Sequence, residues 1–146
     1  MIEYADLECP YCAKANSLLA AMGVRRVFRH FPVTSKHPRV RALAHAAEAA
    51  RLQGRFWELH DSLLSDQGRF DDPHLWERCR ALGLDLERFE RDRRSAAVAD
   101  RVDRDFATGV RAGVTSTPTQ FLAGRPYPGV PGRDLAAAVE AARAAP

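Results

Sequence analysis

Two of the three cysteines in the chain stand close together, in the motif Cys9-Pro10-Tyr11-Cys12. Two cysteines separated by two residues can close a small disulfide or open to a dithiol. The thiolate form of cysteine is the nucleophile that attacks disulfides, so the motif points to thiol–disulfide exchange. In that reaction Cys9 would form a mixed disulfide, and Cys12 would be placed to attack it.

The residues that follow predict a helix beginning at this motif. Pro10 suits a first helical position, because its φ angle is fixed and an N–H group there would have no partner. Apolar residues then recur at helical spacing until Gly23 ends the run, namely Tyr11, Ala15, Leu18, Leu19 and Met22. Cys9 is thus predicted at the N-cap, where free N–H groups and the helix dipole favour a thiolate.

A zinc site is the main alternative for two closely spaced cysteines. Zinc takes four ligands, usually from two such pairs. The remaining cysteine is Cys79, and the five histidines form no H-x₃₋₅-H pair near it. We therefore expect no metal and no cofactor apart from the redox-active disulfide itself. Cys79 shares a helical face with Leu75 and Leu82, and we expect it to be buried and chemically quiet.

Two carboxylates, Asp6 and Glu8, come just before Cys9. A carboxylate near a thiolate would raise the thiol pKa by like-charge repulsion, against the effect of the helix dipole. The alternative is that both side chains only face solvent in a loop. Tyr11 is expected to be exposed at the site, where its ring would offer an aromatic surface to a client.

Short strand-like segments flank the cysteine helix. Residues 2–5 precede it, and residues 24–31, rich in β-branched and aromatic side chains, follow it. Two strands joined by a helix in this way should be parallel. The three arginines of the second segment favour an edge position in the sheet.

From Thr34 to about Ala112 the pattern is helical throughout. Helices are expected to begin near Pro38, Phe56, Asp72, Asp85 and Ser95, and Gly54, Gly83 and Gly113 are expected to end three of them. Asp72 is expected to cap the third helix, with Pro73 in its first turn. Asp85 and Ser95 are expected to cap the next two.

A strand pattern resumes at Val114. Thr117-Pro118 leads into a predicted strand over residues 119–122, then a turn and a proline-containing edge strand over 125–127. A last helix follows. The whole predicts one α/β domain over residues 1–146, with an α/β frame at 1–33 and 114–146 and an all-helical insertion at 34–113.

The overall composition argues against two classes of function, nucleic-acid binding and membrane spanning. Lysine and arginine total 22 against 19 acidic residues, a net charge of +3 that is too small to indicate nucleic-acid binding. No stretch approaches the ~20 apolar residues of a membrane span. No signal peptide is recognisable after Met1, which predicts a cytoplasmic location for the chain as written, or a periplasmic or other extracytoplasmic one if a segment precedes it.

Four stretches, in their order, resemble the DsbA-like thiol–disulfide oxidoreductases, including the domains of this type fused to sodium/proton antiporters. They are residues 3–12 (EYADLECPYC), 29–32 (RHFP), 53–60 (QGRFWELH) and 113–119 (GVTSTPT). The resemblance implies a thioredoxin fold with a helical insertion between the second strand and the cis-proline strand.

The resemblance also implies roles for individual residues. Cys9 would be the attacking cysteine and Cys12 the resolving one, with Pro10 and Tyr11 supporting the site. Pro118 matches the family's cis-proline, so we expect a cis Thr117–Pro118 bond beside the cysteines, with the neighbouring backbone free to pair with a bound peptide. The partners implied are protein or small-molecule thiols and disulfides.

Two other functions are possible on such a frame. A glutathione-dependent isomerase or transferase needs one catalytic Ser or Cys and no resolving thiol, and a non-catalytic thioredoxin-like binding module should have lost one cysteine. The intact pair argues against both. The sequence does not name the client, the redox partner, the direction of electron flow or the oligomeric state.

Overall fold

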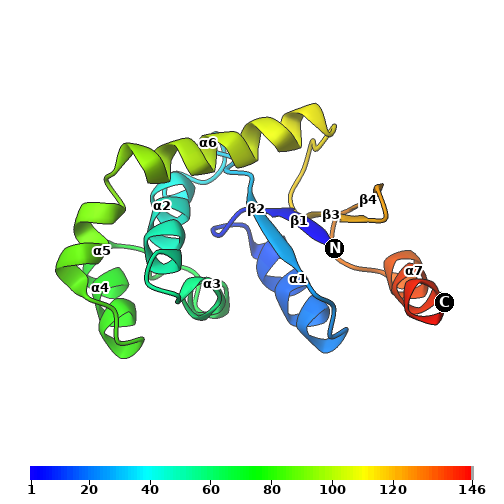
Figure 1. Ribbon diagram of the computed structural model, residues 1–146, viewed down its shortest axis with the longest axis horizontal. Helices are drawn as coiled ribbons and strands as arrows, with labels where there is room; N and C mark the ends of the chain where they lie inside the picture. The colour runs from blue at the N-terminus through cyan, green and yellow to red at the C-terminus, as the bar shows by residue number, and fades with distance from the viewer. Residues whose placement is uncertain (146) are drawn as a thin grey trace.

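The computed structural model describes residues 1–145 and has a four-stranded sheet surrounded by seven helices (Figure 1). Pro146, the last residue of the predicted domain, lies outside the described residues. The elements in chain order are β1 (Ile2–Ala5), α1 (Pro10–Ala21), β2 (Val27–His30), α2 (Val40–Arg51), α3 (Phe56–Ser65), α4 (Asp72–Ala81), α5 (Leu86–Asp92), α6 (Ala96–Arg111), β3 (Thr119–Leu122), β4 (Arg125–Pro128) and α7 (Arg133–Ala144). The predicted mixed α/β architecture is confirmed.

The strand order in the sheet is β2-β1-β3-β4. β1 and β2 are parallel, with Ile2 opposite Val27, and this confirms the predicted βαβ unit. β3 is antiparallel to both β1 and β4. The outer places of β2 and β4 suit their composition, because charged residues and Pro126 are tolerated at a sheet edge.

Successive strand residues face opposite sides of the sheet, and each side has its own helices. Ala5 and Phe28 belong to the main core, which α2 and α3 complete on one side. Tyr4 and Phe31 pack with Val114 in a second cluster, on the side where α6 contacts β2. Figure 1 shows α1 and α6 on opposite sides of the sheet, with α2–α5 grouped beside it.

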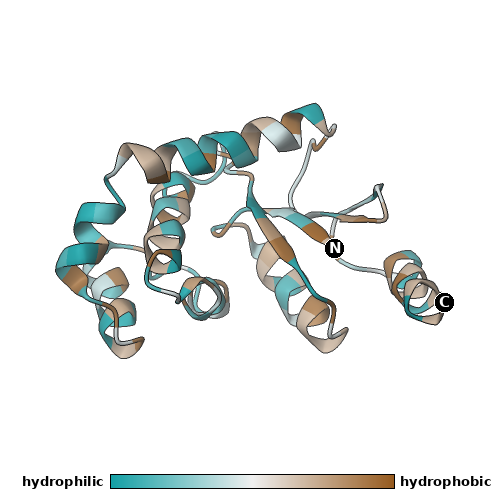
Figure 2. Cartoon of the chain, in the orientation of Figure 1, coloured by the Kyte–Doolittle hydropathy of each residue, from teal (hydrophilic) through white to brown (hydrophobic). Residues whose placement is uncertain are grey.

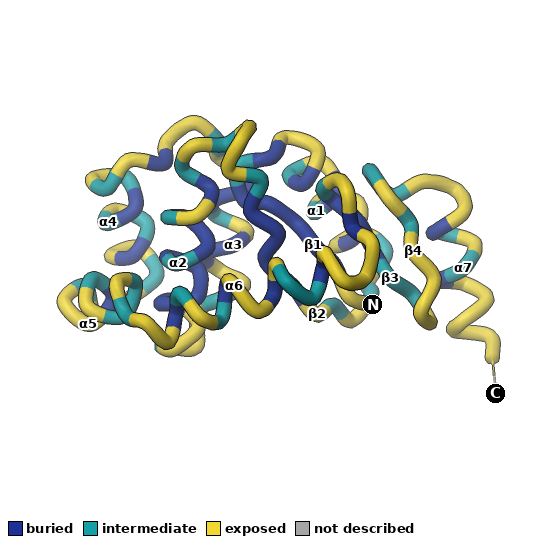
Figure 3. Tube along the Cα trace, turned by 90° about the horizontal axis from the view of Figure 1, so that it is seen from above, coloured by how far each residue is buried: buried dark blue, intermediate teal, exposed yellow. Residues whose placement is uncertain are grey.

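The helical insertion supplies most of the main core. Eight of the 12 residues of α2 are buried, and five of those are alanines whose small side chains permit close helix packing. Figure 3 shows the buried residues concentrated where α2 and α3 meet the sheet, while α5 and α7 are largely exposed. Figure 2 shows the corresponding mixture of hydrophobic and hydrophilic residues along each outer helix.

α6 approaches the sheet most closely at Gly109. A Cβ atom at this position would lie 2.6 Å from Cδ2 of Phe31 and 2.9 Å from Cδ1 of Tyr4, too close for any other residue. One turn earlier, the buried carboxylate of Asp105 accepts a hydrogen bond from the Arg29 guanidinium at 2.8 Å. The same carboxylate accepts one from the backbone N–H of His30 at 3.2 Å, so it fixes α6 against β2.

Three predicted boundaries are wrong by a few residues. The second strand begins at Val27 and not at residue 24, because its partner β1 is only four residues long. The helix predicted over residues 38–53 covers Val40–Arg51. The N-cap of α4 is Asp71, which has the extended backbone of a cap, and Asp72 is the first helical residue.

The predicted caps at Asp85 and Ser95 are confirmed. The Asp85 side chain accepts a hydrogen bond from the N–H of Arg88, and the Ser95 hydroxyl accepts one from the N–H of Val98. Each bond satisfies one of the N–H groups that the first turn of a helix leaves free.

A buried ion pair joins α2 to the sheet. The carboxylate of Glu48 is 3.1 Å from Nε2 of His30 and also pairs with Arg51 one turn later. Burial alone would raise the pKa of Glu48, but the hydrogen bonds from His30 and Arg51 outweigh it and lower the pKa from 4.5 to about 2. The ionised form of Glu48 therefore stabilises the fold.

This contribution is present above pH 4.5 and is lost as the pH falls from there through 2, because the folded-state pKa lies below the unfolded value. We predict that Glu48→Gln lowers the free energy of unfolding at neutral pH by up to about 3 kcal/mol. The same substitution should flatten the acid-induced loss of stability. Denaturant titrations across this pH range measure both effects.

Glu58→Gln is the matched control, because Glu58 also pairs with an arginine three residues away, Arg55, but both side chains are exposed. Glu58→Gln should leave the dependence of the free energy of unfolding on acidic pH almost unchanged. An equal effect of the two substitutions, or a Glu48→Gln profile that keeps the wild-type acid dependence, would contradict the assignment.

Candidate active site

The cysteine pair lies at the start of α1, as predicted. Cys9 is the N-cap with extended φ and ψ angles of −77° and 123°, and Pro10 is the first helical residue. The carbonyl of Cys9 accepts hydrogen bonds from the N–H groups of Cys12 and Ala13 at 3.1 and 3.2 Å. The first turn therefore places its N–H groups beside the Cys9 side chain.

The two sulfurs lie at different depths. Cys9 is 4% exposed and lines an open groove, whereas Cys12 is 1% exposed and lies in the core behind it. The Sγ of Cys12 accepts a hydrogen bond from the backbone N–H of Asp6 at 3.4 Å. Tyr11, between the cysteines, is 65% exposed, which confirms that prediction. A molecule in the groove can thus reach Cys9 and not Cys12.

The surroundings give the two thiols opposite acidities. A hydrogen bond from the Cys12 thiol has the largest effect on the pKa of Cys9 and outweighs the opposite effect of burial. The N–H groups of Cys12 and Tyr11, together with Thr117, act in the same direction, and all these groups lower the pKa of Cys9 to about 5. Burial raises the pKa of Cys12 above its ordinary value, and the neighbouring Cys9 raises it further. These pKa shifts place one thiolate in the pair at neutral pH, on the Cys9 sulfur that lines the groove.

The segment around Pro118 lies against Cys9. The Thr117–Pro118 peptide bond is cis, and the carbonyl oxygen of Thr117 is 3.7 Å from Sγ of Cys9. Two hydrogen bonds hold this segment: the Thr119 hydroxyl donates to the carbonyl of Ser116 at 2.8 Å, and the N–H of Gly129 donates to the carbonyl of Pro118 at 2.7 Å. The segment that precedes β3 thereby forms a wall beside the Cys9 sulfur.

Asp6 is buried beneath the loop of residues 33–39, which connects β2 to α2. Its Oδ2 accepts a hydrogen bond from the N–H of Val33 at 3.0 Å and lies 2.7 Å from Nδ1 of His37. Its Oδ1 accepts one from the N–H of Glu8 at 2.8 Å. The solvent-facing alternative is wrong for Asp6, which is 1% exposed, because the loop folds back over it.

Glu8 anchors the far end of the same loop. Its Oε2 accepts a hydrogen bond from the backbone N–H of Arg39 at 2.8 Å, and its side chain is half-buried. The two carboxylates before the cysteine motif are thus both used as hydrogen-bond acceptors for backbone groups. Their suggested influence on the acidity of Cys9 stays a prediction.

The groove beside Cys9 has a volume of about 310 Å³. Three segments form it: the start of α1, the loop after β2 and the residues before Pro118. The lining residues are Cys9, Pro10, Tyr11, Val33, Lys36, His37, Thr115, Ser116 and Thr117. Sequence reasoning missed Lys36 and His37, since no motif marks a loop residue that tertiary folding brings to the site.

Gln67, in the connection between α3 and α4, was also missed. Its side-chain amide donates hydrogen bonds to the carbonyls of Leu7 and Cys9 at 3.3 and 3.0 Å. The helical insertion thereby holds the backbone just before α1. A glutamine in a connection between helices gives no sequence signal for such a contact.

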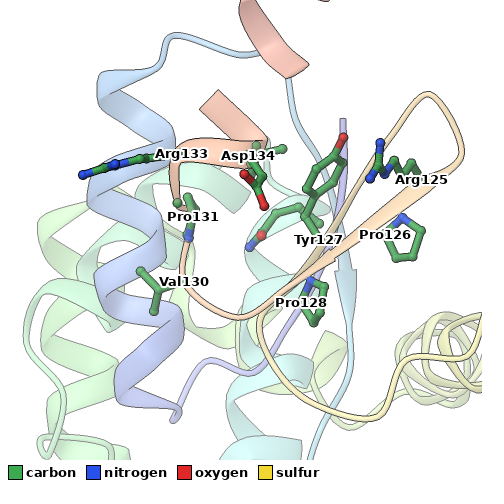
Figure 4. Close-up of a pocket in the computed structure, with 11 residues that line it drawn as sticks. Arg125, Pro126, Tyr127, Pro128, Val130, Pro131, Arg133 and Asp134 are labelled. Carbon is green, nitrogen blue, oxygen red and sulfur yellow. The ribbon is translucent and has the colours of Figure 1, made fainter. Parts of the chain in front are cut away.

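A larger hollow, of about 480 Å³, lies between β4 and the start of α7, with Tyr127 and Asp134 on its sides (Figure 4). Neither cysteine lines it. Cys79 is likewise remote from the groove, fully buried in the main core on α4, and burial raises its pKa to about 12. The groove at Cys9 is therefore the candidate active site.

Two features are absent from residues 1–145. No group of three or more His, Cys, Asp or Glu side chains is placed to hold a metal ion there. No helix among these residues has the length and apolar character needed to cross a membrane.

We predict that the ultraviolet absorbance of thiolate in the reduced protein titrates with an apparent pKa near 5. Cys9→Ser should abolish this titration. Cys12→Ser should largely preserve it, because a hydroxyl can still donate a hydrogen bond to the Cys9 thiolate, whereas Cys12→Ala should raise the pKa. A titration that is unshifted from about 8.5 in the wild type, or identical in Cys12→Ala, would contradict this assignment.

Comparison with known proteins agrees with this site. The chain is 40% identical over 134 residues to the Na(+)/H(+) antiporter NhaA 3 of Salinispora tropica and 41% identical over 150 aligned positions to the NhaA antiporter of Herminiimonas arsenicoxydans. The matches cover 88% and 98% of this chain. They cover only 21% and 24% of the antiporters, so the chain spans about a fifth to a quarter of the length of these relatives.

Solved structures share the fold. A thioredoxin-like oxidoreductase from Silicibacter pomeroyi superposes with a TM-score of 0.86 at 28% identity, covering 99% of this chain and 86% of that one. The thiol–disulfide exchange protein α-DsbA2 of Wolbachia pipientis gives 0.82 at 18% identity, covering 97% and 80%. A family model, described as the DSBA-like thioredoxin domain, matches residues 1–142. The resemblance predicted from the sequence is confirmed, and the chain belongs to the family of DSBA-like thioredoxin domains.

Proposed function

We propose that this domain exchanges disulfides with thiol-containing partners through Cys9 and Cys12. The observation that carries the proposal is the contrast between the two sulfurs: Cys9 lines the groove and has its pKa lowered to about 5, whereas Cys12 lies in the core and has its pKa raised. This is the arrangement that a nucleophile and a resolving thiol require. Membership of the family supports the same class of reaction.

The proposed exchange has two steps. The Cys9 thiolate attacks one sulfur of a client disulfide, forms a mixed disulfide with it and releases the other sulfur as a thiolate. Cys12 then loses its proton and attacks Sγ of Cys9, which releases the second client thiolate and leaves a Cys9–Cys12 disulfide. Two electrons pass from the domain to the client; the reverse sequence oxidises a client dithiol.

The lowered pKa of Cys9 bears on the direction of electron flow. A stabilised thiolate favours the dithiol form of the domain and makes its disulfide more oxidising. The value of about 5 lies between those of the thioredoxin and DsbA nucleophiles, about 7 and about 3.5. We infer a reduction potential between those of the same two proteins, about −270 and −120 mV.

We predict that the domain reduces insulin disulfides in the presence of dithiothreitol. Cys9→Ser should lose this activity, and Cys12→Ser should lose turnover but accumulate a mixed disulfide with the client. Cys79→Ala is the control and should keep wild-type turnover, since that thiol lies in the core. Full activity of Cys9→Ser, or release of client from Cys12→Ser as fast as from the wild type, would overturn the proposal.

The same assay tests both rival functions, because neither a glutathione-dependent isomerase or transferase nor a non-catalytic binding module would reduce insulin with dithiothreitol. Replacing dithiothreitol with glutathione then separates the two: an isomerase or transferase would not need Cys12, so Cys12→Ser would keep its activity. A binding module would show no turnover in any variant.

The reduction potential of the Cys9–Cys12 pair is a separate prediction. Equilibration in glutathione buffers, followed by alkylation of free thiols and a mass measurement, gives this potential directly. We expect a value less reducing than thioredoxin, with the disulfide opened by millimolar glutathione. A potential below about −270 mV would make the domain a reductase and would contradict the inferred direction.

A further inference from the structure

The groove beside Cys9 carries basic side chains and no acidic one. Of the nine residues that line it, Lys36 has a charged side chain, His37 an imidazole, and none is Asp or Glu. Lys36 is one of only two lysines in the chain, and its side chain is exposed. An incoming molecule therefore meets the positive charge of Lys36 on the part of the groove formed by the loop after β2.

The nearest acids do not neutralise Lys36. Asp6 is buried beneath the loop, where Val33 and His37 occupy its carboxylate. Glu8 accepts a hydrogen bond from the N–H of Arg39 and opens onto a different hollow. Within residues 1–145, no carboxylate oxygen lies within 4.0 Å of the Lys36 ammonium. Its charge is available to a ligand in the groove.

The loop that carries Lys36 is fixed in place. The N–H groups of Lys36 and His37 both donate to the carbonyl of Val33 at 3.0 Å, which closes a tight turn. The bond between His37 and Asp6 ties this turn to the residue whose own N–H contacts Cys12. The backbone of Lys36 is therefore held in place beside the groove, and its side chain extends from a fixed turn.

The dimensions of the groove favour an extended peptide. A volume of about 310 Å³ lies at the small end of ligand sites, which span about 300–1,000 Å³. It can take a short segment around one cystine and no larger folded surface. Tyr11 offers such a segment an exposed aromatic ring, and Thr115 and Ser116 add exposed polar residues to the groove lining.

We propose that Lys36 makes the domain select peptide disulfides that carry an acidic residue beside the cystine. The inference rests on the proposed function and names its substrate class. An acidic side chain at that place could form an ion pair with the Lys36 ammonium, whereas a basic side chain could not. An exposed ion pair favours association by up to about five-fold and is screened by salt.

The test uses two peptides of equal length, each with one internal disulfide and a fluorescence reporter of its reduction. One has Asp and Glu beside a cysteine, and the other has Lys and Arg at the same places. We expect kcat/KM with dithiothreitol as reductant to be about five-fold higher for the acidic peptide at low salt. The ratio should approach one as ionic strength rises.

Lys36→Glu should reverse the ratio, and Lys36→Gln should bring it near one. Lys14→Glu is the matched control, because it makes the same charge change at an exposed position of α1, two residues beyond Cys12, outside the groove lining. It should keep the wild-type preference. A substitution that changes the acidity of Cys9 alters kcat/KM for both peptides alike, so the ratio of the two kcat/KM values is unaffected by it.

The failures are distinguishable. Equal rates for the two peptides in the active wild type would overturn the role of Lys36 and leave the proposed function standing. A reversal in Lys14→Glu as large as in Lys36→Glu would do the same, because it would assign the preference to overall charge. Absence of reduction of either peptide by the wild type would overturn the proposed function and this inference together.

Discussion

The arrangement of the site depends on Asp6, the residue that directly follows β1. Its N–H contacts Sγ of Cys12, its carbonyl accepts a hydrogen bond from the N–H of Cys9 at 3.2 Å, and its carboxylate holds Glu8, Val33 and His37. A buried carboxylate is costly unless its oxygens are hydrogen-bonded, and here both are. One residue thus positions both cysteines and one wall of the groove.

This constraint links Cys9 to the groove that lies beside it. The hydrogen bond from Cys12 and the N–H groups at the start of α1 lower the pKa of Cys9, and Thr117 contributes from the segment before β3. The groove wall belongs to the loop after β2, more than 20 residues away in sequence. Because Asp6 bonds to both, the loop cannot shift without disturbing residues next to the cysteines. Asp6 thus holds both the cysteine motif and the loop that forms one wall of the groove.

The helical insertion also holds parts of the backbone around this site. Gln67 holds the carbonyls of Leu7 and Cys9, and Asp105 on α6 fixes the backbone of β2 from the opposite side of the sheet. Thr115, which lines the groove, is the second residue after the insertion. The α/β frame therefore carries the reactive pair, while the insertion and its two connections shape what can approach it.

The sequence by itself determined the parts of this protein that depend on neighbours in the chain. The cysteine spacing, Pro10 and the helical period placed Cys9 at an N-cap, and the order of segments gave the parallel βαβ unit and both edge strands. Only tertiary structure decided that Asp6 is buried, that Lys36 and His37 line the groove, and that Gln67 reaches the cap. The physical reason is that local propensities act over a few residues, whereas these contacts form between segments that meet only when the insertion packs on the sheet.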